Sequence, residues 1–124
     1  MINVLLVDDH RIMLEGLALL LRAQPDIAVV GEALDGAEAV ERVRELRPDV
    51  VVMDVLMPDM DGVEATQIIK REWPGVRVIG LSMNKNDQTA LKMYSAGAEA
   101  YLTKGGPVAV LVAVIRGEAE VHGA

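Results

Sequence analysis

Four short apolar runs in this 124-residue chain are each followed by side chains that could hold a metal ion or a phosphate group. In chain order these side chains are the carboxylates of Asp8 and Asp9, the carboxylate of Asp54, the hydroxyl of Ser82 and the amine of Lys104. Carboxylates bind cations or act as nucleophiles, whereas hydroxyl and ammonium groups bind the oxygens of a phosphoryl group. The pattern therefore indicates metal or phosphate chemistry, provided that the fold brings these residues together.

Asp54 is the most informative of these residues. It follows the run 50–53, which is apolar at every position, as expected of a central parallel strand that helices cover on both faces. Ligands of open α/β sheets bind beyond the carboxyl ends of the strands, so a carboxylate there is placed for chemistry. This stretch alone leaves a second interpretation equally open, because Asp before a Pro-containing loop often begins a turn.

Apolar runs alternate with segments of helical periodicity along the whole chain, which predicts repeated βα units and a parallel sheet. The expected strands are 3–7, 28–33, 50–54, 76–81 and 100–103. The expected helices are 11–23, 37–46, a helix from about 62 to the residues before Pro74, and 87–96. Gly97 suits the left-handed residue that commonly closes a helix. With one more helix at the end, five βα pairs form a three-layer, doubly wound α/β fold.

Two of the expected helices carry apolar stripes that we expect to face the core. The stripe of the helix 11–23 consists of Met13, Leu17, Leu20 and Leu21. The stripe of the helix 87–96 consists of Ala90, Leu91 and Tyr94.

The last element, 108–115, fits two patterns. Its valines alternate as they would in a strand, while its apolar residues also repeat at helical spacing. We favour a helix because Pro107 suits a first helical position. Such a helix is apolar on nearly all sides. Once its core face is assigned, Val110 and Val114 remain as apolar residues outside that face. We expect this surplus surface to contact a second protomer or an output domain.

Composition bounds the class of protein. The length suits one domain with a substantial core. A net charge of −7 without a basic stripe disfavours nucleic-acid binding by this chain. Cysteine is absent, which excludes disulfides and thiolate metal sites and suits a reducing cytoplasm. No apolar run is long enough for a membrane helix.

The motifs, taken in order, resemble the receiver domains of two-component response regulators over essentially the whole chain. They are Asp8-Asp9-His10, Met53-Asp54 with Met57-Pro58 and Met60-Asp61-Gly62, Leu81-Ser82, Ala96-Gly97-Ala98 and the stretch 101–104. The first motif and the stretch 81–83 look most like receivers attached to LuxR-type helix-turn-helix DNA-binding domains. The family implies a flavodoxin-like (βα)5 fold, the CheY-like fold, with strand order 2-1-3-4-5.

The resemblance also implies a phosphoryl-transfer site. Asp54 would be the phosphoacceptor, whose carboxylate attacks a phosphohistidine with Mg²⁺ as the cofactor. Lys104 and Ser82 would bind the oxygens of the transferred group, because phosphoryl transfer asks the protein mainly for alignment and charge neutralisation.

The resemblance implies metal ligands and a switch as well. The metal ligands would be Asp9, Asp54, the backbone carbonyl of Leu56 and, through water, Asp8. On phosphorylation, Ser82 would move toward the phosphoryl group and Tyr101 would turn into the space that opens. The surface formed by 87–96, 100–103 and 108–115 would then change shape.

The implied strand order explains why these residue types are needed. Asp54 would lie one strand spacing, about 5 Å, from the ends of the neighbouring strands. Lys104 would be two spacings, about 10 Å, away, which only a long side chain can bridge. Three carboxylates so close together would raise one another's pKa values unless a cation neutralised them. His10 could be a phosphate carrier, but beside an acidic pair it is better interpreted as a solvated neighbour.

The partners are implied in the same way. A sensor histidine kinase would supply the phosphoryl group. A homodimer would form through the last helix or through the surface of 87–96, 100–103 and 108–115. Residues 1–117 would be the receiver and 118–124 a tail or the start of a linker, with no effector domain in this chain, whereas a full-length protein would bind DNA.

Other functions remain as alternatives. A stand-alone or degenerate receiver would act as a protein-binding module, although Asp9, Asp54 and Lys104 speak against it. We expect that the chain is not an enzyme with multiple turnovers. An aspartate-based phosphohydrolase would need a second Asp at the position of Leu56. A flavodoxin would want a phosphate loop rich in Ser, Thr and Gly in place of the stretch 8–10.

Overall fold

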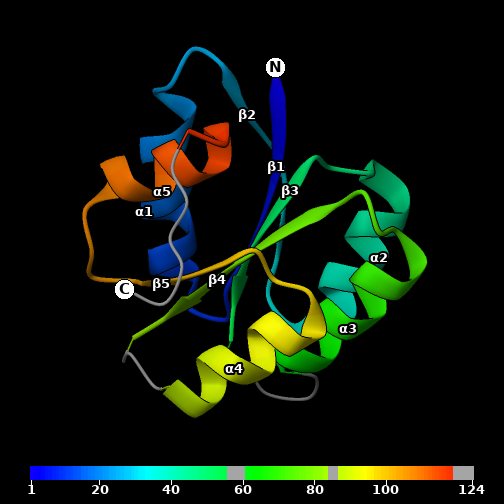
Figure 1. Ribbon diagram of the computed structural model, residues 1–124. Coiled ribbons are helices and arrows are strands. Elements are labelled where there is room, and N and C mark those ends of the chain that lie inside the picture. Colours follow the sequence, from blue (N-terminus) through cyan, green and yellow to red (C-terminus); the bar gives the residue numbers. More distant parts are fainter. Residues whose placement is uncertain (56–60, 84–86, 119–124) are drawn as a thin grey trace.

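The computed structural model describes residues 1–55, 61–83 and 87–118, which form a parallel sheet between two layers of helices. Five strands pair in the order β2-β1-β3-β4-β5, so β3 is central, as expected (Figure 1). The strands are β1 (Ile2–Val7), β2 (Ile27–Ala33), β3 (Val50–Asp54), β4 (Arg77–Ser82) and β5 (Ala100–Thr103). The expected doubly wound α/β fold is confirmed.

A helix follows each strand, and the first four helices lead to the next strand. The helices are α1 (Arg11–Arg22), α2 (Gly36–Leu46), α3 (Gly62–Glu72), α4 (Asp87–Ala96) and α5 (Val108–Arg116). Helices α1 and α5 cover one face of the sheet, and α2, α3 and α4 cover the other (Figure 1). The ambiguous last element is therefore a helix. None of these described helices has both the length and the apolar character needed to span a bilayer.

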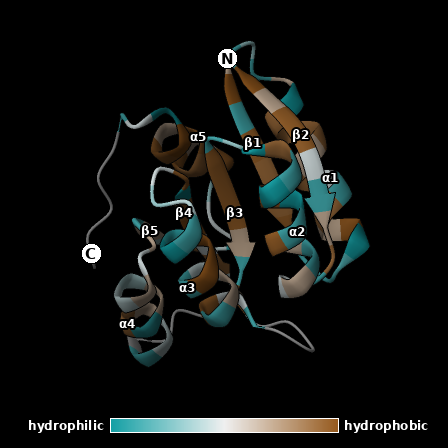
Figure 2. Ribbon diagram, turned by 90° about the vertical axis from the view of Figure 1, so that its right-hand side faces the viewer, coloured by the Kyte–Doolittle hydropathy of each residue, from teal (hydrophilic) through white to brown (hydrophobic). Residues whose placement is uncertain are grey.

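The strands supply core residues to both helical layers because successive side chains point to opposite faces. In β1, Val4 and Leu6 pack toward α1 and α5, while Leu5 and Val7 pack toward α2 and α3. All five residues of β3 are buried. This explains the uninterrupted apolar run in the sequence, which Figure 2 shows as brown strands beneath helices with mixed outer faces.

The expected core stripe of α1 is partly wrong. Leu14, Ala18 and Leu21 are the buried residues of this helix, whereas Met13 is 42% exposed and Leu20 is 50% exposed. Apolar side chains occur on nearly every side of α1, so periodicity does not identify which stripe meets the sheet. The packing of α1 on β1 and β2 decides it, and part of the apolar surface stays outside the core.

The expected faces of α4 and α5 also need correction. In α4, Ala90 and Tyr94 pack against the core as expected, but Leu91 is 67% exposed and the fully buried residue is Met93. In α5, Val110 is 40% exposed as expected, but Val114 is buried. The reason is that α5 lies across the sheet with its C-terminal half enclosed by the core, so Val114 is not surplus surface.

Two glycines allow the tight turns of the fold. Gly97 has φ +113 and closes α4 in the left-handed conformation, as expected. Gly62, at the start of α3, lies so close to the end of β3 that an added Cβ would come within 2.4 Å of the Asp54 carbonyl oxygen and 2.8 Å of Val55 Cα. No side chain fits there without movement of the backbone.

We predict that Gly62→Ala lowers the free energy of unfolding by about 1–3 kcal/mol, because the new methyl group overlaps the backbone. Gly16→Ala is the matched control: Gly16 is exposed in α1 and a Cβ there meets nothing within 4 Å. This control should gain up to about 1 kcal/mol from helix propensity. Urea unfolding of both variants measures the difference, and equal stability would contradict the close approach.

Candidate functional site

Strand register aligns the residues that were singled out in the sequence. Val7 of β1 pairs with Met53 of β3, so Asp8 comes level with Asp54. Asp54 pairs with Leu81, and Ser82 pairs with Thr103. Asp8, Asp54, Ser82 and Lys104 therefore meet at the carboxyl edge of the sheet, the ligand-binding edge of this fold class.

Lys104 forms ion pairs with two carboxylates. Its Nζ lies 2.9 Å from Asp8 Oδ2 and 3.1 Å from Asp54 Oδ2, and its side chain is only 2% exposed. The backbone N–H of Lys104 donates to the Ser82 carbonyl at 2.8 Å, which continues the pairing of β4 with β5 past Thr103. The lysine thus spans two strand spacings, as expected, and joins the two acids in a buried network.

Asp9 and His10 lie at the more exposed side of the site. His10 Nδ1 is 3.2 Å from Asp8 Oδ1 and 3.1 Å from Asp9 Oδ1. The backbone N–H of His10 donates to Asp8 Oδ1 at 2.8 Å. Asp9 Oδ1 is buried and accepts no hydrogen bond from any described residue. Three carboxylates thus converge with one ammonium group, and the buried Oδ1 of Asp9 lacks a hydrogen bond within the described part of the chain.

Burial has the largest effect on the pKa of Asp54, the acid at the end of the central strand. It raises the pKa of Asp54 to about 6, since desolvation outweighs the favourable charge of Lys104 and the negative charge of Asp8 adds to the rise. Burial also acts to raise the pKa of Asp8, but the Lys104 ammonium and the hydrogen bonds from His10 hold that pKa below its usual value. The two buried acids therefore differ: Asp8 is held ionised, and Asp54 titrates closer to neutral pH.

The donor set fits a divalent cation. One donor atom each from Asp8, Asp9, His10 and Asp54 lie within 4.8 Å of one another. Three carboxylates against one ammonium group leave two formal negative charges, and oxygen ligands of this kind suit Mg²⁺. The expected fourth protein ligand, the carbonyl of Leu56, lies outside the described residues. The residues present therefore match a Mg²⁺ site by charge and by donor chemistry.

Backbone hydrogen bonds hold Val55, directly after Asp54, and Gly62, at the start of α3, close to the sheet. The N–H of Val55 donates to the Leu81 carbonyl at 3.1 Å, and the N–H of Gly62 donates to the Val55 carbonyl at 2.9 Å. The Asp61 side chain caps α3 by accepting a hydrogen bond from the N–H of Glu64. The helix cap and the close approach of Gly62 fix the wall of the site beside Asp54.

Ser82 and Tyr101 occupy positions compatible with the expected switch. Ser82 is buried at the end of β4. The Tyr101 ring is already buried in this structure, against Gly80, where an added Cβ would come within 3.1 Å of the ring. Its hydroxyl forms no hydrogen bond with the described residues. A movement of Tyr101 on phosphorylation therefore stays a prediction.

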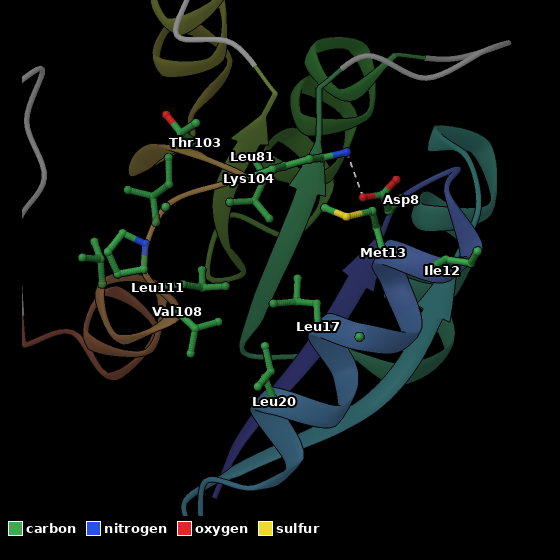
Figure 3. A pocket seen from close by; sticks show the side chains of 15 residues that line it. Asp8, Ile12, Met13, Leu17, Leu20, Leu81, Thr103, Lys104, Val108 and Leu111 are labelled. Atoms are coloured by element: carbon green, nitrogen blue, oxygen red, sulfur yellow. Dashed lines mark ion pairs between the residues drawn. The ribbon is translucent and has the colours of Figure 1, made fainter.

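An apolar groove of about 580 Å³ adjoins the site. Met13, Leu17 and Leu20 of α1 line one side, and Val108 and Leu111 of α5 line the other (Figure 3). The ion pair between Lys104 and Asp8 lies at one end of this groove (Figure 3). The exposed stripe of α1 thus lines a groove that reaches the acidic site.

Sequence reasoning leaves out two details of this site. His10 is a solvated neighbour of the acidic pair, as expected, with a side chain that is 64% exposed, but the contacts of its Nδ1 with Asp8 and Asp9 were not foreseen. The steric role of Gly62 was not foreseen either, although its place just before a helix was a signal for a close backbone approach. The expected residues Asp8, Asp9, Asp54, Ser82 and Lys104 do come together.

Comparison with known proteins agrees with this architecture. The family model described as "Response regulator receiver domain" matches residues 4–116. The transcriptional regulatory protein LiaR of Bacillus subtilis (strain 168) is 47% identical over 116 residues, which cover 94% of this chain and 55% of LiaR. The chain spans about half the length of the curated relatives that it matches.

Solved structures of response regulators have a similar fold. A two-component response regulator of the LuxR family from Aurantimonas sp. SI85-9A1 is 40% identical, with a TM-score of 0.87 over 93% of this chain and 85% of its own. The CheX-CheY-BeF3-Mg+2 complex from Borrelia burgdorferi contains a chain that is 27% identical, with a TM-score of 0.85 over 95% of this chain and 90% of its own.

We predict that Asp54→Asn stabilises the metal-free protein at pH 8 by about 1–3 kcal/mol, because the buried carboxylate is ionised only above its raised pKa. The folded-state pKa of about 6 exceeds the ordinary value of 3.8, so the free energy of unfolding of wild type falls as pH rises from about 4 through 6. At pH 4 the two proteins should be close in stability.

Urea unfolding in the presence of EDTA at both pH values measures this effect. Asp61→Asn is the control, because Asp61 is an exposed helix cap that Asn can replace. A stability difference for Asp54→Asn that does not depend on pH would contradict the electrostatic explanation.

Proposed function

The chain belongs to the family of response regulator receiver domains, and from this premise we propose that it accepts a phosphoryl group on Asp54 from a sensor histidine kinase. The observation that carries the proposal is the buried network in which Lys104 contacts both Asp8 and Asp54. Such a network places a carboxylate nucleophile beside a fixed cation at the open edge of the sheet. The relatives are response regulators, and we expect self-modification of this chain without turnover of a substrate.

The cofactor in this proposal is Mg²⁺. Asp9, Asp54 and the carbonyl of Leu56 would hold it directly, and Asp8 would hold it through water. When bound, the ion would neutralise negative charge on the phosphoryl oxygens. The neighbour from Borrelia burgdorferi is described with Mg²⁺ and BeF3, which supports the assignment by analogy.

Asp54 performs the covalent step in this proposal. One carboxylate oxygen of Asp54 attacks the phosphorus of the donor phosphohistidine, an O–P bond forms and the P–N bond breaks. The electron pair of the broken bond stays on the imidazole of the donor, which takes up a proton from solvent. Lys104 neutralises the charge on the phosphoryl oxygens, and the hydroxyl of Ser82 donates a hydrogen bond to one of them.

The output would be a change of surface at α4, β5 and α5. Ser82 is the last residue of β4, and Tyr101 lies in the neighbouring β5, opposite Gly80, so a movement of Ser82 could be passed to Tyr101. The buried hydroxyl of Tyr101, which forms no hydrogen bond within the described residues, supports a side chain with more than one low-energy position.

We assign residues 1–117 to the receiver and 118–124 to a tail or the start of a linker. We infer that a LuxR-type DNA-binding domain follows in the full-length protein, because the chain spans about half of relatives such as LiaR, which is named a transcriptional regulatory protein. The net charge of −7 supports an indirect role, in which this chain itself does not bind nucleic acid. A cytoplasmic location would go with this role.

We predict that incubation with a phosphohistidine donor and Mg²⁺ adds the mass of one phosphoryl group to wild type and none to Asp54→Asn, because the amide cannot act as the nucleophile. Asp61→Asn, which changes an exposed acid near the site, should be labelled like wild type. Intact mass spectrometry measures both. Lys104→Met should be labelled at least about tenfold more slowly, since a buried cation would be lost from the transition state.

A degenerate receiver that binds proteins without being phosphorylated predicts a different result. It would stay unlabelled, and beryllium fluoride would cause no Mg²⁺-dependent change in its Tyr and Trp fluorescence. Either observation on the wild type would contradict the proposed function.

Self-association is the second part of the proposal. Exposed apolar side chains gather along α1 and the neighbouring part of α5, where Met13 and Leu20 face the groove beside Val110. The alternative surface on α4 offers Leu91, which is isolated from this cluster. The distribution favours contact with a second protomer through α5 together with α1 over contact through α4, β5 and α5.

We predict that Met13→Glu and Val110→Glu weaken self-association of the beryllofluoride-treated protein, because each places a charge in an apolar contact. Leu91→Glu should associate like wild type. Sedimentation velocity at several concentrations measures this. A loss of association in Leu91→Glu alone would indicate that the contact is formed by α4, β5 and α5. Unchanged association in all three variants would exclude both surfaces as the contact.

A further inference from the structure

Gly80 lies inside β4, beside the residues of the expected switch, and has no part in the proposed transfer. We propose that Gly80 is a positioning residue of the switch, because the space left by its missing side chain holds the buried ring of Tyr101. The residue at position 80 therefore sets the balance between a buried and an outward position of that ring. This inference rests on the proposed function only for the link between the ring and the phosphoryl group.

The backbone does not require glycine at this position. Among the described glycines, Gly97 and Gly117 have a φ in the left-handed region, whereas Gly80 does not. The register of β4 with β5 is continuous through the pair Gly80 and Tyr101, so there is no bulge. Glycine in the interior of a strand weakens the strand and often marks a close approach of other atoms. The reason for a glycine here is therefore steric.

A side chain at position 80 would enter occupied space. An added Cβ on Gly80 would lie 3.0 Å from Met93 Cε, 3.1 Å from Tyr101 Cδ1 and 3.6 Å from Val55 Cγ2. Carbon atoms in ordinary contact are about 3.5–4.0 Å apart, so the first two distances are too short. Atoms of Met93 and Tyr101 thus fill the room that a side chain at this position would take.

Three parts of the fold bound the space over Gly80. Tyr101 enters it from β5, Met93 from α4 and Val55 from the position directly after β3. Ser82 lies two residues after Gly80 in β4, so its side chain points to the same face of the sheet. A displacement of Val55 or Ser82, which both lie next to the proposed site, would change the room that the ring has.

Of the two closest neighbours, Tyr101 is the one that a larger residue at position 80 would displace. Met93 is fully buried, and its sulfur accepts a hydrogen bond of 3.9 Å from the hydroxyl of Thr66, which is also fully buried. Tyr101 lies in β5, a strand at the edge of the sheet, and keeps a small exposed area. The ring of Tyr101 therefore has a route outward that Met93 lacks.

The buried position of Tyr101 combines a gain and a cost. Burial of the aromatic ring is favourable. Burial of its hydroxyl, which forms no hydrogen bond with the described residues, is unfavourable. Because the two effects oppose each other, the buried position has only a moderate advantage. A small steric change at position 80 is then sufficient to alter the balance.

Substitutions at the two positions should act in opposite directions. Gly80→Val fills the space and disfavours the buried ring, whereas Tyr101→Phe removes the unpaired hydroxyl and favours it. A ligand that binds one of two conformations better binds more tightly when that conformation is already populated. If the buried ring goes with the phosphorylated state, the two variants change the affinity for beryllofluoride, a phosphoryl mimic, in opposite directions.

The first measurement is the position of the ring, read by ¹⁹F NMR of the whole chain labelled with 3-fluorotyrosine. The chain has two tyrosines, and the signal of Tyr101 is the one that Tyr101→Phe removes. We expect this signal to be insensitive to exchange of H₂O for D₂O in wild type and sensitive in Gly80→Val. The double variant Gly80→Val with Met93→Ala should be insensitive again, because the smaller residue at position 93 restores the room.

The second measurement is a titration with beryllofluoride in the presence of Mg²⁺. We expect Gly80→Val to lower the affinity by about fivefold or more, and Tyr101→Phe to raise it by about twofold or more. Ile79→Val is the matched control, because Ile79 is buried in the same strand but faces α1 and α5. This control should keep both the ring signal and, within about twofold, the affinity of wild type. Circular dichroism verifies that each variant is folded.

The outcomes separate this inference from the proposed function. A Tyr101 signal that stays insensitive to D₂O in folded Gly80→Val would overturn the inference, and so would equal beryllofluoride affinities in Tyr101→Phe, Gly80→Val and wild type. Both results leave the phosphoacceptor role intact. A wild type that binds no beryllofluoride would overturn the role, and the ring signals of wild type, Gly80→Val and the double variant would still decide whether Gly80 positions Tyr101.

Discussion

The site depends on a carboxylate that is buried at the tip of the central strand and on the lysine that reaches it from two strands away. Asp54 loses most of its hydration because β3 is covered on both faces, and this loss raises its pKa to about 6. Lys104 compensates in part, with Nζ 3.1 Å from Asp54 and 2.9 Å from Asp8. Lys104 also pairs with Asp8, so its buried ammonium group keeps a counter-charge when Asp54 is neutral.

That constraint has a chemical consequence. The ammonium group of Lys104 pairs with both Asp8 and Asp54, and Asp9 lies next to them. The cluster therefore has more negative than positive charge. A divalent cation is the simplest way to balance such a cluster, and a phosphoryl group brings oxygens that both cations can bind. The buried ion pairs that are present in the absence of ligand therefore belong to the same network that would neutralise charge during transfer.

The two helical layers contribute different features to the site and its surroundings. On one face, α3 is brought against the end of β3 by Gly62, and this contact fixes the wall beside Asp54. On the other face, α1 and α5 enclose the sheet but leave Met13, Leu20 and Val110 on the surface. The groove between these two helices begins at the ion pair of the site, so a change in the site has a direct physical route to an apolar surface.

Much of this protein follows from its sequence by itself. Alternating apolar runs and helical segments determined the order and type of every element except the last, because hydrophobic periodicity is a local property. For the last element periodicity fitted both a strand and a helix, and Pro107 favoured the helix. The convergence of Asp8, Asp54, Ser82 and Lys104 followed as well, since the carboxyl ends of parallel strands must lie along one edge. Family resemblance supplied the strand order, and the structure confirms it.

Only the tertiary structure decided the features that depend on contacts between elements. Helices such as α1 are apolar on several sides, so the rotation that exposes Met13 and buries Leu14 is set by packing against the sheet. Val114 is covered for the same reason. The direction of the His10 ring depends on where Asp8 and Asp9 lie in space, which no local pattern records. Local periodicity specifies what each segment becomes, whereas side-chain environment is a property of the assembled layers.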